Sequence, residues 1–93
     1  MNKAIYFKGS NCGVCQDLFP KVKVHFEQHY PLLEFQIVQV EDQPEIAAQY
    51  TIFAIPALLI FIEDKEQFRF VRYFSPGQID EKLQRTYHLL FDE

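Results

Sequence analysis

Residues 4–15 read Ala4-Ile5-Tyr6-Phe7-Lys8-Gly9-Ser10-Asn11-Cys12-Gly13-Val14-Cys15. The apolar run Ala4–Phe7 is typical of a buried β-strand, and the four residues after it are typical of a turn that ends a strand. Cys12 and Cys15 are the only cysteines of the chain, and a helical pattern starts beside them. A strand, a turn and a cysteine pair at the start of a helix indicate an α/β protein with thiol chemistry.

The residues beyond the cysteines predict an amphipathic helix from Gly13 to about His29. Its apolar positions recur every four residues, at Val14, Leu18, Val22 and Phe26. Pro20 lies inside this helix and should bend it, because proline has no N–H to donate to the carbonyl of Gln16.

The middle of the chain predicts three strands, at Leu33–Val40, Ala57–Ile62 and Phe68–Phe74, and a short helix at Glu45–Tyr50. The run Ala57–Ile62 is apolar throughout, which indicates a central strand covered on both faces. A charged turn over Glu63–Gln67 should connect it to an antiparallel neighbour.

The last element is a helix whose start is marked by a capping box, with Ser75 as N-cap, Pro76 at the first position and Gln78 at the third. Its expected buried stripe is Ile79, Leu83, Tyr87 and Leu90. The order β-α-β-α-β-β-α predicts a single α/β domain over residues 1–93, with a four-stranded mixed sheet and helices on both faces.

Composition and charge argue against some classes of function. The chain has 93 residues, 48% of them hydrophobic, and a formal net charge of −4 with no block of Lys and Arg. These values argue against a nucleic-acid partner or an anionic membrane surface. The apolar run before Lys8 is too short for a signal peptide or a membrane span, so we expect a cytoplasmic protein. In that reducing compartment, two cysteines are more often catalytic or metal-binding than structural.

Three interpretations of the cysteine pair compete. A disulfide closing a four-residue loop would restrict the unfolded chain by only about 2 kcal/mol, which is little for a structural staple. A zinc site with His25 and His29 would need Cys15 and His25 together, yet they lie about 15 Å apart along one helix. No metal is therefore expected, and His25, His29 and His88 are predicted to be solvated helix residues.

The redox interpretation fits best. Cys12 is expected at the helix N-terminus, where free N–H groups and the helix dipole stabilise a thiolate and lower its pKa. Cys12 is thus the predicted nucleophile. Cys15, one turn further in, should be more buried and should resolve the mixed disulfide.

With these features the chain resembles the thioredoxin family over nearly its whole length. The residues that carry the likeness are Cys12-Gly13-Val14-Cys15, Pro20, Asp42–Tyr50, Ile55-Pro56 and Ser75–Leu83. The resemblance implies a thioredoxin-like fold in its minimal form and the activity of a thiol-disulfide oxidoreductase that needs no bound cofactor. It also implies protein disulfides as substrates and, as a possible electron donor, a reductase of the thioredoxin-reductase type.

The resemblance further implies a cis peptide bond between Ile55 and Pro56, packed against the cysteines. The backbone around Ile55 would then pair with an extended substrate segment. Asn11 and Gly13 are expected to contribute to the same substrate-binding surface. A monomer is expected.

The chain departs from the family at four positions. Asn11 and Val14 stand where the family usually has Trp and Pro, and Tyr6 and Ile37 stand where it has a buried acid and its basic partner. Without a replacement for that pair, Cys15 would lose its proton to water or to the leaving thiolate, and exchange should be slower near neutral pH.

Two other functions stay open. The chain could be a binding module that keeps the fold and grips partners near Pro56 without turnover. It could also be a glutathione-linked reductase of the glutaredoxin type, although the glycine pair that would hold glutathione is absent. The only glycines are Gly9, Gly13 and Gly77.

Overall fold

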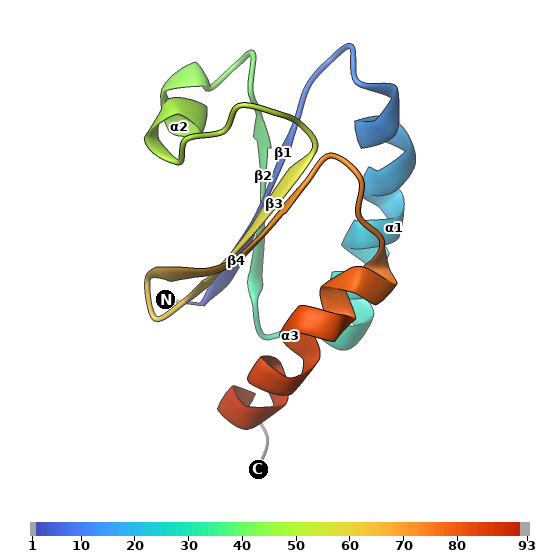
Figure 1. Ribbon diagram of the computed structural model, residues 1–93, viewed down its shortest axis with the longest axis vertical. Helices are drawn as coiled ribbons and strands as arrows, with labels where there is room; N and C mark the ends of the chain where they lie inside the picture. The colour runs from blue at the N-terminus through green and yellow to red at the C-terminus, as the bar shows by residue number, and fades with distance from the viewer. Residues whose placement is uncertain (1, 92–93) are drawn as a thin grey trace.

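The computed structural model describes residues 2–91 and has the predicted element order (Figure 1). The elements are β1 (Lys3–Lys8), α1 (Gly13–His29), β2 (Glu34–Gln39), α2 (Pro44–Gln49), β3 (Ala57–Ile62), β4 (Lys65–Val71) and α3 (Pro76–Phe91). The prediction of an α/β protein with a four-stranded mixed sheet is confirmed.

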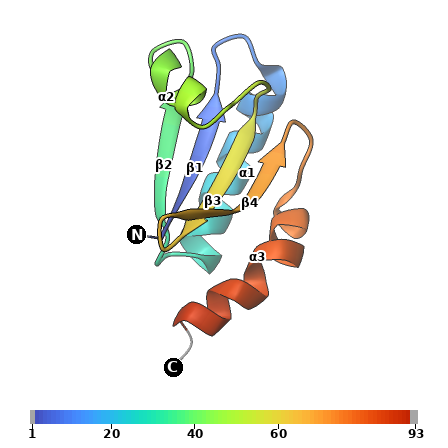
Figure 2. The ribbon, with the colours of Figure 1, turned by 60° about the vertical axis from the view of Figure 1, so that its left-hand side comes forward.

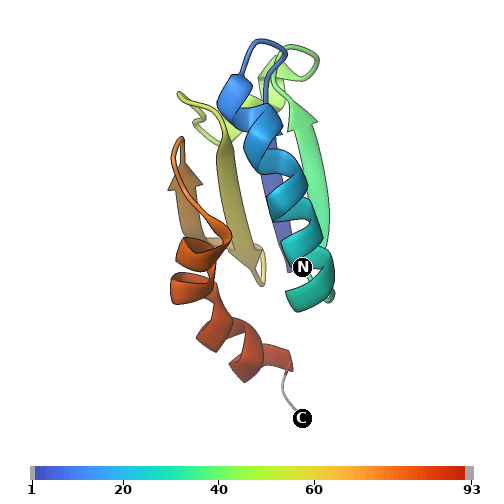
Figure 3. The ribbon, with the colours of Figure 1, turned by 90° about the vertical axis from the view of Figure 1, so that its right-hand side faces the viewer.

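The four strands lie in the order β2-β1-β3-β4 (Figure 2). β1 is parallel to β2 and antiparallel to β3, and β3 is antiparallel to β4. All six residues of β3 are buried, as its continuous apolar run predicts. α1 and α3 cover one face of the sheet (Figure 3), and α2 covers the other (Figure 1).

Alternation along the two central strands divides the core into two clusters. Tyr6 and Leu58 point to the face covered by α1 and α3, where they pack with Leu83 of α3. Their chain neighbours Phe7 and Leu59 point to the opposite face, where the α2 side of the molecule adds partly buried apolar residues. Neighbouring residues on one strand therefore belong to different halves of the core.

Two predicted core positions are wrong. Val14 and Leu90 continue the apolar periodicity of their helices, but their side chains are 39% and 40% exposed. Leu83, in the middle of α3, is fully buried as predicted. Both exceptions lie within two residues of a helix end, where the pattern continues but the sheet no longer covers it.

The β3–β4 connection is tighter than the predicted five-residue turn. Only Glu63 and Asp64 separate the strands, with φ of 53° and 69°. Two successive residues with positive φ are the geometry that two-residue hairpin loops prefer. β4 therefore starts earlier than predicted. It also ends at Val71 rather than at Phe74, because Arg72 has a φ of 69° and turns the chain out of the sheet.

The predicted capping box at the start of α3 is confirmed. The Ser75 backbone N–H donates to Gln78 Oε1 at 2.9 Å, and the Gln78 N–H donates to Ser75 Oγ at 3.2 Å. Each residue satisfies a donor that would otherwise be left without a partner at the helix end.

Asp80 connects α3 to α1. Its carboxylate accepts hydrogen bonds from the Tyr30 hydroxyl and from His25 Nε2, the latter at 2.8 Å. The prediction that His25 is a solvated helix residue is therefore wrong, since its side chain is largely buried in this contact. His25 on α1 and Asp80 on α3 are 55 positions apart in the chain. Local sequence patterns cannot indicate a contact between residues so far apart.

We predict that Asp80→Asn destabilises the protein at neutral pH by about 1 kcal/mol, the typical net contribution of a hydrogen bond. Burial raises the pKa of Asp80, but the hydrogen bonds from Tyr30 and His25 outweigh burial and hold that pKa below its ordinary value. A carboxyl whose pKa is lower in the folded state contributes its full stability above the unfolded pKa and loses it as pH falls.

Urea unfolding of the parent and of Asp80→Asn at pH 7 and at pH 3 measures this effect, with exposed Asp42→Asn as the matched control. The gap between parent and Asp80→Asn should shrink towards pH 3. An equal gap at both pH values would contradict the assignment.

Candidate active site

Cys12 is the N-cap residue of α1, and Cys15 lies in its first turn. Their Cα atoms are 5.2 Å apart, and the two sulfur atoms form a disulfide. Cys15 is completely buried, whereas Cys12 is partly exposed at the surface. An incoming thiol or disulfide can therefore reach Cys12 before it can reach Cys15.

The start of α1 directs a donor at the Cys12 sulfur. The Cys15 backbone N–H points to Cys12 Sγ at 3.1 Å, while the Gln16 N–H donates to the Cys12 carbonyl at 3.1 Å. In the reduced protein, such an N–H and the positive end of the helix dipole favour a thiolate on Cys12.

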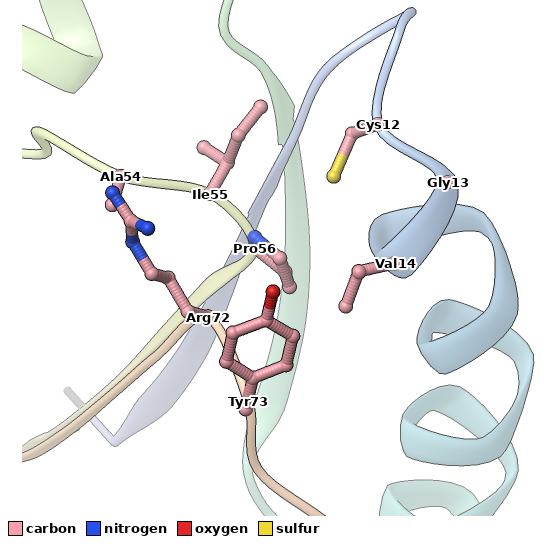
Figure 4. Close-up of a pocket in the computed structure, with 8 residues that line it drawn as sticks. All are labelled: Cys12, Gly13, Val14, Ala54, Ile55, Pro56, Arg72 and Tyr73. Carbon is pink, nitrogen blue, oxygen red and sulfur yellow. The ribbon is translucent and has the colours of Figure 1, made fainter.

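A groove of about 250 Å³ lies beside the pair (Figure 4). It is lined by Cys12, Gly13, Val14, Ala54, Ile55, Pro56, Arg72 and Tyr73. The Ile55-Pro56 peptide bond is cis, as the resemblance implied. The structure thus brings Gly13, Ile55 and Pro56 together with Cys12. Asn11 is exposed on the preceding loop and does not line the groove.

Arg72 and Tyr73 were not predicted as site residues. The apolar alternation of Phe68–Phe74 predicts that both continue a strand, far from any loop function. A left-handed backbone at Arg72 instead places them at the groove. A positive φ is uncommon for arginine, so nothing in the sequence indicated a left-handed backbone at Arg72.

Polar side chains anchor the loop that precedes Cys12. Glu41 Oε2 accepts the Ser10 backbone N–H at 2.8 Å, and Gln39 Nε2 donates to Ser10 Oγ at 2.9 Å. The hydrogen bond from the Ser10 backbone holds the pKa of Glu41 below its ordinary value. The Glu41 carboxylate is therefore charged under physiological conditions and keeps the loop in place.

Gly9 lets this loop approach the cis-proline segment. A Cβ atom on Gly9 would lie 2.6 Å from Ile55 Cδ1 and 3.2 Å from Glu41 Oε2. No Cβ fits there without movement of the Ile55 side chain. The absence of a side chain at Gly9 thus brings the cysteine loop and the Ile55-Pro56 segment into contact.

Tyr6, which the family resemblance aligns with a buried acid, lies behind Cys15. Its hydroxyl donates to the Cys15 carbonyl at 3.3 Å, and its side chain is fully buried. Burial raises the pKa of Tyr6 to about 12, so the hydroxyl stays protonated at neutral pH. Ile37 pairs with Tyr6 in the sheet and has an exposed side chain. This pair offers no proton acceptor for Cys15.

Lys8 is a charged residue close to the inner cysteine. It lines a hollow together with Cys15 and Phe19, and its Nζ lies 4.4 Å from the centre of the Phe19 ring. The aromatic face holds the ammonium group by a cation–π contact. The contact fixes a positive charge on the Cys15 side of the pair.

Within residues 2–91, no three His, Cys, Asp or Glu side chains are grouped so that they could hold a metal ion. His25 contacts Asp80, and the His29 ring lies tilted against the His25 ring with ring centres 4.5 Å apart. In the same part of the chain, no helix has the length and apolar character needed to cross a membrane.

A partly exposed and a buried cysteine at a helix start, facing a cis-proline segment across a groove, define a redox protein of the thioredoxin type. The chain belongs to the thioredoxin family, because the family model named Thioredoxin matches residues 2–85.

Similar proteins agree with this assignment. The chain is 31% identical over 85 residues to the thioredoxin-like protein YdfQ of Bacillus subtilis, which covers 91% of this chain and 75% of YdfQ. It is 26% identical to a thioredoxin-like protein of the SPbeta prophage, YosR, over 88% of this chain and 95% of YosR. Among solved structures, thioredoxin 1 of Thermosipho africanus superimposes with a TM-score of 0.84 at 26% identity, covering 95% of this chain and 97% of that one.

We predict that Tyr6→Phe lowers the free energy of unfolding by about 1 kcal/mol, because it removes the buried hydrogen bond to the Cys15 carbonyl. Urea unfolding measures the difference. Tyr50→Phe is the matched control, since the Tyr50 ring packs on Phe7 but its hydroxyl makes no hydrogen bond within residues 2–91. Equal unfolding midpoints for the two variants would show that the Tyr6 hydroxyl contributes nothing.

Proposed function

We propose that this protein is a thiol-disulfide oxidoreductase that exchanges its Cys12–Cys15 pair with disulfides in other proteins. The observation that carries the proposal is the asymmetry of the pair. Cys12 is accessible, and its sulfur accepts a hydrogen bond from a backbone N–H at the start of the helix. Cys15 is buried behind it. This is the arrangement that a two-step exchange requires.

In the reducing direction, the Cys12 thiolate attacks one sulfur of the substrate disulfide. The substrate S–S bond breaks, its second sulfur leaves as a thiolate and takes a proton, and a mixed disulfide with Cys12 forms. Cys15 then attacks Cys12 Sγ and releases the first substrate sulfur as a thiol. Two electrons have passed to the substrate, and the protein is left with the Cys12–Cys15 disulfide.

The proton of Cys15 has no acceptor of suitable pKa on β1. Tyr6 occupies that place with a pKa of about 12. The proton therefore goes to water or to the leaving thiolate, and the second step is slow near neutral pH. Lys8, on the same side as Cys15, favours the thiolate once the proton has left.

The substrate segment lies in the groove in extended form and pairs with the backbone around Ile55, next to Pro56. Gly13 allows its close approach at Cys12, and Asn11 borders the same surface. The protein acts as one domain over residues 1–93, as a monomer in the cytoplasm and without a bound cofactor. A reductase of the thioredoxin-reductase type returns the pair to the dithiol.

We predict that Cys12→Ser abolishes the reduction of insulin disulfides with dithiothreitol as electron source, because it removes the attacking sulfur. Turbidity of the released insulin chains measures the reaction, and dithiothreitol alone gives the background rate. A Cys12→Ser variant as active as the parent would exclude Cys12 as the nucleophile.

The Cys15→Ser variant separates an enzyme from a binding module. With an intact Cys12 and no resolving thiol, an oxidoreductase should accumulate mixed disulfides with cell proteins. Non-reducing gels detect these species, and dithiothreitol reduces them. A binding module would instead retain the same partners in Cys12→Ser and Cys15→Ser, and the bound proteins would survive dithiothreitol.

We also predict that Tyr6→Asp accelerates exchange at pH 7 by about tenfold or more, because it supplies a buried carboxylate to accept the Cys15 proton. Burial should raise the pKa of this carboxyl, so a new titration should enter the pH–rate profile. Tyr6→Asn, without an ionisable group, is the control. An unchanged pH–rate profile for folded Tyr6→Asp would contradict the proposed lack of a proton acceptor.

A further inference from the structure

Arg72 is held against the cis-proline segment by its own backbone. The Arg72 N–H donates to the Pro56 carbonyl at 2.7 Å, and its φ of 69° turns the chain away from β4 at this point. Figure 4 shows the Arg72 side chain running along the groove towards Ala54. The position of this side chain is therefore coupled to the segment that we propose binds substrate.

The Arg72 guanidinium has no partner within residues 2–91. Neither an ion pair nor a hydrogen bond engages it there, and the residue is exposed. Arg69, three residues earlier, is very different, since its guanidinium binds Glu66 and the backbone carbonyls of Tyr50 and Thr51. Arg69 is used within the fold, whereas Arg72 is available to a ligand.

Arg72 is also the only charged side chain among the eight residues that line the groove. Asp17 and Lys21, which carry opposite charges, line an adjoining hollow together with Arg72 and Tyr73. The chain as a whole carries a net charge of −4. A positive group at the groove of an acidic protein is a local feature that distinguishes one ligand from another.

One exposed aromatic ring lies next to Arg72 in the groove, and a second is exposed on the segment that precedes Pro56. Tyr73 is 78% exposed and lines the groove, and Phe53, next to Ala54 in the chain, is 90% exposed. An amphipathic ring such as that of Tyr73 can pack on an apolar group while its hydroxyl stays in water.

We propose that the groove selects an extended polypeptide segment that carries an acidic side chain next to its disulfide-bonded cysteine. Arg72 pairs with the acidic side chain, while Tyr73 packs against the apolar parts of the segment. This inference rests on the proposed oxidoreductase function and names the substrate class for it. Arg72 acts as a specificity residue and takes no part in the exchange of electrons.

The test uses three disulfide-linked peptide dimers of the sequence Gly-Xaa-Cys-Xaa-Gly, with blocked ends, in which Xaa is Glu, Gln or Lys. Each dimer is mixed with the reduced protein, and the second-order rate of peptide thiol release is measured at low ionic strength. The variants are Arg72→Gln, Arg72→Glu and Arg72→Lys. Arg85→Gln, an exposed arginine on α3, is the matched control.

The measured quantity is the ratio of the Glu-peptide rate to the Lys-peptide rate. Flanking charges change the reactivity of the peptides themselves, and this effect cancels when the ratio of a variant is divided by that of the parent. We expect Arg72→Gln to lower the ratio about threefold, in the range of an exposed ion pair. Arg72→Glu should lower it further, and Arg72→Lys and Arg85→Gln should keep the parent value. Added salt should reduce the difference.

An unchanged ratio in Arg72→Gln and Arg72→Glu, with peptide reduction still active, would overturn this inference and leave the oxidoreductase function standing. A fall of the same size in Arg85→Gln would also overturn it, because net charge alone would then explain the preference. If the parent reduced neither the peptides nor insulin, the proposed function and this inference would fail together.

Discussion

The antiparallel pairing of β1 with β3 is the constraint on which the site depends. It places Phe7, near the end of β1, opposite Ala57, the first residue of β3. The chain just after Phe7 leads to Cys12, and the chain just before Ala57 is Ile55-Pro56, so the two must meet at the same end of the sheet. A slip of one residue in this pairing would turn the side chains of one strand to the opposite face of the sheet. The two core clusters could then not form as they do.

The outer strands bring their own contributions to this same end. β2 is parallel to β1 and pairs Gln39 with Lys8, which places Glu41 where it can hold the cysteine loop. β4 is antiparallel to β3 and pairs Val71 with Ala57, which delivers Arg72 to the proline segment. Every strand thus ends or begins at the site, and a rigid sheet holds a site made largely of loop residues.

The parts of the fold that depend on local pattern were predictable from the sequence. Ala57–Ile62 is a buried strand because it is apolar throughout, and the capping box at Ser75 follows from neighbouring residues. Arg72 and the contact of His25 with Asp80 were missed, since one depends on an unusual backbone angle and the other on residues far apart in the chain. The cis bond at Pro56 was accessible only through family resemblance.

Tyr6 contributes to the stability of the core, whereas a buried carboxyl at this position would contribute to proton transfer. A buried carboxyl at this position would carry a desolvation cost that the folded chain must offset elsewhere. The tyrosine instead fills the space, packs at a tilt against Phe19 with ring centres 5.4 Å apart, and donates its hydroxyl to the Cys15 carbonyl. A position that could serve proton transfer thus serves the packing of the core. At this one position, the domain has a packed and hydrogen-bonded side chain in place of a proton acceptor.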